Sequence, residues 1–176
     1  MMGGKNLREA RIISRRGAYL TPMNTSHINE FRKRIHKFNA KEILDSGYGS
    51  TLDCLKIMYS SSEAYVCRNK QGEIVFIGGL WFGDEAPQMF CMFANNLEEN
   101  TFLAAKMAKA MLGMFEPLHP TLTMTVSSEF EHMLSWALWL GFEPCGLSDG
   151  NRHVEFVRCI SNLNSVTDKA LRPVVH

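Results

Sequence analysis

The residue types best able to do chemistry, cysteine and histidine, are scattered along this sequence. The five cysteines are Cys54, Cys67, Cys91, Cys145 and Cys159. No C-x-x-C pair occurs, and no cysteine or histidine cluster has zinc-ligand spacing. An odd number of unpaired cysteines is typical of reduced, mostly buried thiols in a cytosol-like compartment. We therefore predict no structural metal.

Candidate nucleophiles and bases are also isolated. Cys91 lies inside the apolar run QMFCMF, where burial would leave its thiol unreactive. His132 has no carboxylate partner nearby in sequence, and Glu85 lies in a loop where a carboxylate is usually solvated. No Ser/His/Asp arrangement and no P-loop can be assembled. The sequence thus predicts no catalytic residue.

The composition is typical of a single globular domain. The chain has 176 residues, of which 45% are hydrophobic and 21% charged. Its formal net charge of +1 gives no reason to expect nucleic acid or an anionic membrane as a partner. No apolar run reaches the length that spans a bilayer, and the N-terminus lacks the apolar core of a signal peptide, so we expect a soluble protein.

We predict a flexible N-terminus over residues 1–10, one domain over 11–160 and a polar tail over 161–176. The N-terminal segment is basic: Lys5, Arg8, Arg11, Arg15 and Arg16 accompany a single acid, Glu9. It could be a small anion-binding arm, but a solvated strand edge with a flexible terminus is the simpler interpretation.

Apolar spacing and turn residues predict the elements that would position a site. A first strand ends at Pro22, and two or three short helices follow, with Ile28, Phe31, Ile35 and Phe38 at helical spacing. The runs EAYVCR, EIVFIGGLWFG and QMFCMF predict a β-meander. A helix over about 100–115, the strand TLTMTV, a second helix and the strand RHVEFVR complete the order.

The second of these helices lies in SSEFEHMLSWALWLGFEPCG, residues 127–146. Ser128 and Glu131 have the spacing of a capping box. Gly141 can adopt the left-handed conformation that ends a helix, and Phe142 can pack back on the last turn.

The succession of TLTMTV, a capped helix, a Gly-Phe stop and a final strand resembles the GCN5-related N-acetyltransferase fold, over roughly residues 10–160. The resemblance implies an α/β (α+β) protein with a mixed, mostly antiparallel sheet and helices on both faces. Residues 87–93 and 121–126 should lie side by side and parallel, because a helix-containing crossover joins them. In the superfamily this pair of strands splays apart to admit the cofactor.

Two longer stretches resemble small internal virion or virion-assembly proteins of short-tailed bacteriophages. They are YLTPMNTSHINEF…AKEILDSGYGSTLDCLKIMYSSSEAYVCRNKQGEIVFIGGLWFG and LTMTVSSEFEHMLSWALWLGFEP. This resemblance implies an acetyltransferase-like fold and a role in the particle or its assembly.

The residues that serve cofactor chemistry in the superfamily are missing. Active members hold the cofactor pyrophosphate in a Q/R-x-x-G-x-G/A turn at a helix N-terminus, where the sequence here is ANNLEENTF, without glycine. Glu98 and Glu99 would stabilise the helix start but repel a diphosphate. The position of the usual acid, a tyrosine, is Ala137, and QMFCMF has no carboxylate to act as base. We predict no cofactor-binding residue, and a crevice blocked or lined by Met89, Phe93, Glu98, Glu99 and Phe102.

These absences favour a non-catalytic acetyltransferase-like protein that contacts other phage or host proteins, or itself, in virion assembly or as a minor internal virion protein. It would act in the host cytoplasm or the virion interior. The alternative is an active N-acyltransferase using acetyl-CoA. A factor that binds a bacterial enzyme of the host is a third hypothesis.

The helix within residues 128–141 offers a candidate partner surface. At about 100° per residue, Phe130, Met133, Leu134, Ala137 and Leu138 gather on the side expected to face the sheet. The residues His132, Trp136 and Trp139 fall on the outer side. They could bind a partner, because tryptophan is enriched at binding hot spots. Alternatively, Val166, Leu171 and Val174 of the tail could cover them.

Overall fold

The computed structural model describes residues 12–13, 17–83 and 85–160. The predicted flexible N-terminus, its basic residues up to Arg11 together with Arg15 and Arg16, and the tail with Val166, Leu171 and Val174 lie outside the described residues.

The described elements follow the predicted order except at two places: the predicted first strand contains two strands, and an additional strand precedes the last one. The strands are β1 (Ile12–Ile13), β2 (Tyr19–Pro22), β3 (Ser62–Arg68), β4 (Ile74–Trp81), β5 (Gln88–Phe93), β6 (Thr121–Ser127), β7 (Glu143–Ser148) and β8 (His153–Cys159). The helices are α1 (Thr25–Phe31), α2 (Lys37–Asp45), α3 (Thr51–Ser61), α4 (Leu97–Phe115) and α5 (Glu131–Trp139).

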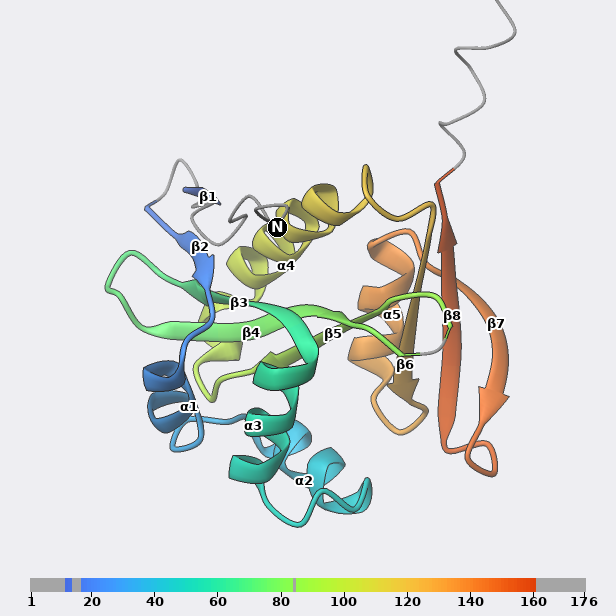
Figure 1. Ribbon diagram of the computed structural model, residues 1–176, viewed down its shortest axis with the longest axis horizontal. Helices are drawn as coiled ribbons and strands as arrows, with labels where there is room; N and C mark the ends of the chain where they lie inside the picture. Colours follow the sequence, from blue (N-terminus) through green and yellow to red (C-terminus); the bar gives the residue numbers. More distant parts are fainter. Residues whose placement is uncertain (1–11, 14–16, 84, 161–176) are drawn as a thin grey trace, which may run out of the picture.

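The described strands form one mixed sheet in the order β1-β2-β3-β4-β5-β6-β8-β7. Every neighbouring pair is antiparallel except β5 and β6, which are parallel. Helix α4 makes the crossover between these two strands (Figure 1). The predicted mostly antiparallel sheet and the predicted parallel pair are both confirmed.

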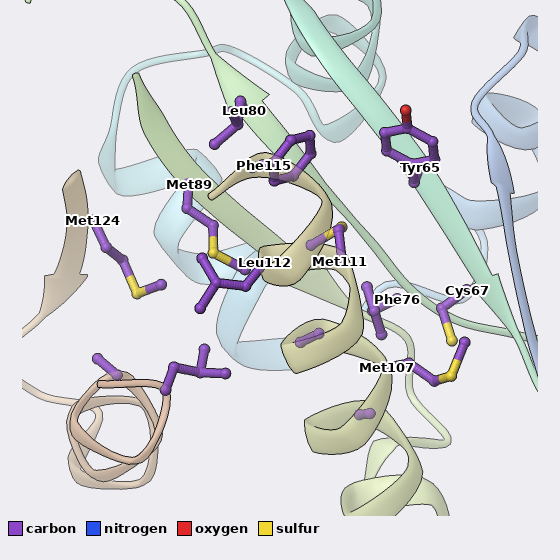
Figure 2. Close-up of a cluster of buried hydrophobic side chains, with 14 of the residues drawn as sticks. Tyr65, Cys67, Phe76, Leu80, Met89, Met107, Met111, Leu112, Phe115 and Met124 are labelled. Atoms are coloured by element: carbon purple, nitrogen blue, oxygen red, sulfur yellow. The ribbon is translucent and has the colours of Figure 1, made fainter. Parts of the chain in front are cut away.

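Helices cover both faces of the sheet, as predicted, so the protein has two apolar cores (Figure 1). Helices α4 and α5 pack on one face; its core includes the residues that Figure 2 labels, among them Met107, Met111 and Phe115 of α4. Helices α1, α2 and α3 pack on the other face through Phe31, Ile43 and Leu55. Successive side chains along a strand point to opposite faces of the sheet, so one strand can contribute side chains to both cores.

The region between α1 and α2 departs from the predicted helical run. Helix α1 ends at Phe31, and Ile35 forms an isolated antiparallel bridge with Ala94. Helix α2 then starts at Lys37, and His36 caps it by accepting a hydrogen bond from the N–H of Phe38. Phe38, the last residue of the predicted helical spacing, is 44% exposed. Helical spacing failed here because pairing with the end of β5 replaces the helical hydrogen bonds over this segment.

The predicted capping box at the start of α5 is wrong. Helix α5 begins at Glu131, with Phe130 in the N-cap position and no side-chain cap. The hydroxyl of Ser128 donates instead to the carbonyl oxygen of Arg152, at 2.9 Å. Ser128 therefore links the β6–α5 connection to the loop before β8 by a hydrogen bond, instead of capping the helix.

The predicted end of α5 is confirmed. Gly141 has φ +84°, its N–H donates to the carbonyl of Leu138, and the N–H of Phe142 donates to the carbonyl of Ala137. Phe142 is buried. These bonds satisfy helix-end carbonyls in the manner of a glycine-terminated helix.

Strand β7 had not been predicted. Its residues EPCGLS are mostly exposed, and its pairing with β8 is irregular between Pro144 and Gly146. A strand at the sheet edge with a proline, a glycine and no buried face lacks the alternation by which strands are recognised.

Arg158 of β8 ties the ends of both helices of one layer to the sheet. Its guanidinium donates to the carbonyls of Leu140 and Gly141 at 3.0 and 3.2 Å, and to the carboxylate of Glu116 at 2.6 Å. Glu116 follows α4 directly. One side chain thus joins α4, α5 and β8.

We expect Gly141→Ala to destabilise the protein by about 1 to 3 kcal/mol. The residue has a positive φ, and an added Cβ would lie 2.0 Å from Nη1 of Arg158. Urea unfolding measures the change. Gly113→Ala is the matched control, because no atom lies within 4 Å of its added Cβ, and inside helix α4 it should stabilise by about 0.5 to 1 kcal/mol. Equal stability of wild type and Gly141→Ala would contradict the assigned role of Gly141.

Candidate ligand crevice between strands β5 and β6

Strands β5 and β6 diverge soon after they meet. Their register contains one pair, Gln88 opposite Thr123, and the N–H of Thr123 donates to the carbonyl of Pro87 at 3.0 Å. Toward the carboxyl ends of the strands, a cavity of about 260 Å³ occupies the gap. Because backbone groups alternate along a strand, the N–H and C=O of Cys91 face this gap, on the same edge as those of Phe93.

The linker between α1 and α2 fills the far end of the gap. The N–H of His36 donates to the carbonyl of Phe93 at 2.8 Å, and the N–H of Asn95 donates to the carbonyl of Arg34 at 2.6 Å. The side-chain oxygen of Asn39 accepts the N–H of Phe93 at 2.8 Å. At its carboxyl end, the edge of β5 that faces β6 is therefore paired with the α1–α2 linker.

The cavity wall combines both faces of the sheet. Helix α2 and its flanks, β5, β6 and α5 all contribute, and Figure 2 shows Met89 of β5 and Met124 of β6 on the side covered by α4. The residues of the wall include His36, Phe38, Asn39, Glu42, Tyr48, Cys54, Met58, Met89, Cys91, Phe93, Met124, Phe130, Met133, Trp136 and His153. The predicted lining residues Met89 and Phe93 are confirmed, whereas Glu98, Glu99 and Phe102 are not part of this wall.

Glu42 is the one Asp, Glu, Lys or Arg among the described residues that line the cavity. It is half-buried and accepts a long hydrogen bond, 3.4 Å, from the side-chain N–H of Asn39. Burial raises the pKa of the Glu42 carboxyl, while Asn39 and the nearby His153 act in the opposite direction. Burial, assisted by the same carboxylate, raises the pKa of the Cys54 thiol to about 11. Glu42 thus faces the cavity as a poorly solvated acid.

Two histidines, His36 and His153, also line the cavity. Burial, with a smaller effect from Lys37, lowers the pKa of His36, whose Nδ1 accepts the N–H of Phe38. His153 lines the cavity, and its Nδ1 lies 3.7 Å from a carboxylate oxygen of Asp149, a residue that is not part of the wall. Its capping role and its burial therefore both favour the neutral form of His36.

Aromatic contacts lie on two sides of the cavity. On one side the rings of Phe38 and Phe130 lie 5.0 Å apart, and Lys41 forms an exposed salt bridge with Glu129 at 3.2 Å. On the other side the rings of Phe93 and Trp136 meet edge to face at 5.0 Å. Helices α2 and α5 therefore reach the crevice from opposite faces of the sheet.

The turn between β5 and α4, together with the first residue of α4, already uses three N–H groups within the protein. It consists of Ala94, Asn95 and Asn96, and the N–H groups of Ala94, Asn95 and Leu97 donate to protein carbonyls. Glu98 and Glu99 are exposed in the first turn of α4. Anion sites at helix starts need free N–H groups and no opposing charge. The two glutamates therefore oppose a diphosphate at this helix start.

The structure places the predicted partner residues in different environments. His132 is exposed, and Trp139 is 52% exposed with the Lys109 ammonium 5.2 Å from its ring centre. Trp136 packs on the core and lines the crevice, so its predicted outward placement is wrong. Leu138, predicted to face the sheet, is exposed.

The reason for this rotation of α5 is Leu140. It is buried together with Ala137, and at about 100° per residue it lies on the Trp136 side of Ala137, away from Leu138. Including Leu140 in the apolar face moves the centre of that face toward Trp136.

Of the candidates Cys91 and Glu85, only Cys91 lines the cavity, in the same wall as Glu42. Burial raises the pKa of Cys91 well above its usual range, as expected for an unreactive thiol, and Glu85 is exposed outside the cavity wall. Sequence analysis missed Glu42, Asn39 and His36. They are separated from β5 by about fifty residues, and only the linker pairing brings them to it.

Comparison with known proteins gives the fold. No family model matches the sequence, and no curated protein matches it significantly. Among solved structures, an acetyltransferase from Agrobacterium tumefaciens str. C58 matches with TM-score 0.61 and 19% identity, covering 89% of this chain and 99% of its own. A GNAT-family acetyltransferase from Bacillus anthracis has TM-score 0.61 and 12% identity, with 85% and 98% coverage. Ribosomal-protein-S5-alanine acetyltransferase from Vibrio fischeri has TM-score 0.62 and 9% identity, with 87% and 98% coverage.

The chain therefore has the GNAT-type acyl-CoA N-acyltransferase fold, as the resemblance implied. Within the described ranges, no helix is long and apolar enough to cross a membrane. The same ranges contain no group of three or more His, Cys, Asp or Glu residues placed to hold a metal ion.

We expect acidification to destabilise the protein through two histidine caps. His27 accepts the N–H of Asn24 and His36 accepts the N–H of Phe38, and burial lowers the pKa of both. A histidine pKa lowered by folding gives stability that is complete above the unfolded value of about 6.5 and is lost as pH falls below it. Thermal unfolding between about pH 7.5 and 5 should show this loss.

The paired variant His27→Asn/His36→Asn keeps a capping oxygen but cannot titrate, so its stability should change less with pH over this range. His132→Asn, at an exposed position on α5, is the control and should keep the wild-type slope. An unchanged slope in the paired variant would contradict the role of the caps.

Proposed function

We propose that this chain is a non-catalytic protein with the acyltransferase fold that acts through contacts with other proteins. One observation carries the proposal: the α1–α2 linker pairs with the edge of β5 at Phe93 and Asn95. In an acetyltransferase, the cofactor arm runs between these splayed strands. Here the C=O of Phe93 and the N–H of Asn95 are used by His36 and Arg34. The occupied N–H groups of the β5–α4 turn support the same conclusion.

The resemblance to internal virion and virion-assembly proteins supports the choice of partner. We propose that the partners are phage or host proteins, that self-association is one form of the contact, and that the protein acts in the host cytoplasm or the virion interior. A mass-spectrometric inventory of purified particles beside infected cells tests this proposal. Presence in particles supports an internal virion protein, whereas absence favours an assembly or host-directed role.

An active N-acyltransferase using acetyl-CoA is the second candidate. The names of the structurally similar acetyltransferases favour it over a non-catalytic role. The crevice also favours it, since Glu42 is a poorly solvated carboxylate in a cavity between the two splayed strands. At these low identities the similar structures support the fold alone, so cofactor binding decides between the two candidates.

We expect millimolar acetyl-CoA to leave the unfolding temperature unchanged. A ligand at one hundred times its dissociation constant would stabilise the folded state by about 2.7 kcal/mol. Scanning calorimetry with and without acetyl-CoA measures this, and a catalytically active GNAT enzyme serves as positive control. A saturable stabilisation would overturn the non-catalytic proposal, and acetylation of an amine in the same samples would establish the second candidate.

We expect Trp136→Ala and Trp139→Ala to differ in stability. Trp136 packs on Phe93 and on the core, so its truncation should cost about 2 to 4 kcal/mol. Trp139 is half exposed and contacts Lys109, so its truncation should cost less than about 1 kcal/mol. Urea unfolding measures both changes.

Trp139→Ala then provides a folded variant for testing partner contact. Loss of incorporation into particles, or of co-purification with the wild-type partner, would support the outer face of α5 as the contact surface. Unfolding of Trp139→Ala, or unchanged incorporation, would remove Trp139 from that surface.

A further inference from the structure

The crevice contains one unpaired acid. Among the described residues of its wall, the single side chain of the Asp, Glu, Lys and Arg types is Glu42. None of the salt bridges in the described structure includes it. The bond from Asn39, at 3.4 Å, is too long to compensate a carboxylate well. A half-buried carboxylate without a cation is costly, so a cationic ligand would be stabilised there.

The rest of the wall suits a cation whose charge is spread over apolar groups. Aromatic rings attract cations through their faces, and methionine sulfur is polarisable and adapts to irregular ligands. The aromatic and methionine residues of the wall are Phe38, Tyr48, Met58, Met89, Phe90, Met92, Phe93, Met124, Phe130, Met133 and Trp136. They come from both faces of the sheet and surround the same gap.

Two acceptors of the wall besides Glu42 are already used within the protein. The oxygen of Asn39 already accepts the N–H of Phe93, and Nδ1 of His36 already accepts the N–H of Phe38. A primary ammonium has three donors to satisfy, and each unsatisfied donor in a buried site is costly. A quaternary ammonium has none.

The volume of the cavity limits the size of the ligand. At about 260 Å³ it lies below the range of roughly 300 to 1,000 Å³ that is usual for drug-sized molecules. A cation with a few methyl groups and a short polar arm is suitable, whereas a cofactor as long as acyl-CoA is not.

We propose that the crevice between β5 and β6 binds a small quaternary ammonium compound of the choline type, with Glu42 facing the charge and the aromatic and methionine side chains enclosing the methyl groups. This binding needs neither acyl transfer nor a protein partner, so it can hold or fail independently of the proposed function.

The experiment compares choline with 3,3-dimethylbutan-1-ol, its uncharged isostere, by calorimetric titration of the full chain without acetyl-CoA. We expect choline to bind with a dissociation constant below about 10 mM and the isostere at least about tenfold more weakly. Trp136 lines the cavity, so its fluorescence should follow the same saturation curve. Sodium chloride at equal ionic strength controls for nonspecific salt effects.

Two matched variants test the residue assignment. Glu42→Gln removes the charge and should weaken choline about tenfold while leaving the isostere unchanged. Asp45→Asn, an exposed carboxylate of the same helix outside the wall, should leave choline affinity unchanged. Both variants are checked by urea unfolding. The comparison of the two ligands uses the wild-type protein and does not depend on either variant folding.

Each contrary outcome overturns the proposal. Absence of choline binding at about 10 mM would exclude a site for this cation class. Equal affinity for choline and its isostere would show that the cavity selects shape without charge. Undiminished choline affinity in Glu42→Gln, or an equal loss in Asp45→Asn, would show that Glu42 is not the group that faces the cation.

Discussion

The pairing of the α1–α2 linker with the end of β5 is the interaction on which the site depends. The bonds between His36 and Phe93, and between Asn95 and Arg34, end one helix, start the next and hold α2 over the gap between the splayed strands. They also use the backbone groups that β6 leaves without a strand partner. Without this pairing, Asn39 and Glu42 would have no fixed position relative to β5.

The divergence of β5 and β6 has a separate origin. The fold requires these strands to be parallel and joined through α4, and both cores pack against them. Helix α5 enters the gap from one face through Trp136, while α2 enters from the other through Phe38 and Glu42. The α1–α2 linker is thus hydrogen-bonded to β5 in one part of the opening between the strands, and the cavity occupies the other part.

Sequence reasoning was most successful where local chemistry and packing agree. The alternation of strands, the alanine- and methionine-rich α4, the glycine stop of α5 and the absence of glycine from the β5–α4 turn could all be recognised from neighbouring residues. It failed where a distant partner decides the outcome. Ser128 bonds to Arg152 instead of capping α5, and the buried position of Leu140 turns Trp136 toward the crevice.

The sequence by itself determined the order of most elements, the apolar faces of most helices and the absence of glycine from the β5–α4 turn. These properties follow from backbone sterics, side-chain periodicity and charge over a few residues. Only the tertiary structure decided that residues 34–39 pair with β5, that Glu42 faces the gap and that β7 forms the edge strand beside β8. Such contacts join segments far apart in the chain, and their free energy depends on which backbone groups and surfaces the rest of the fold leaves unpaired.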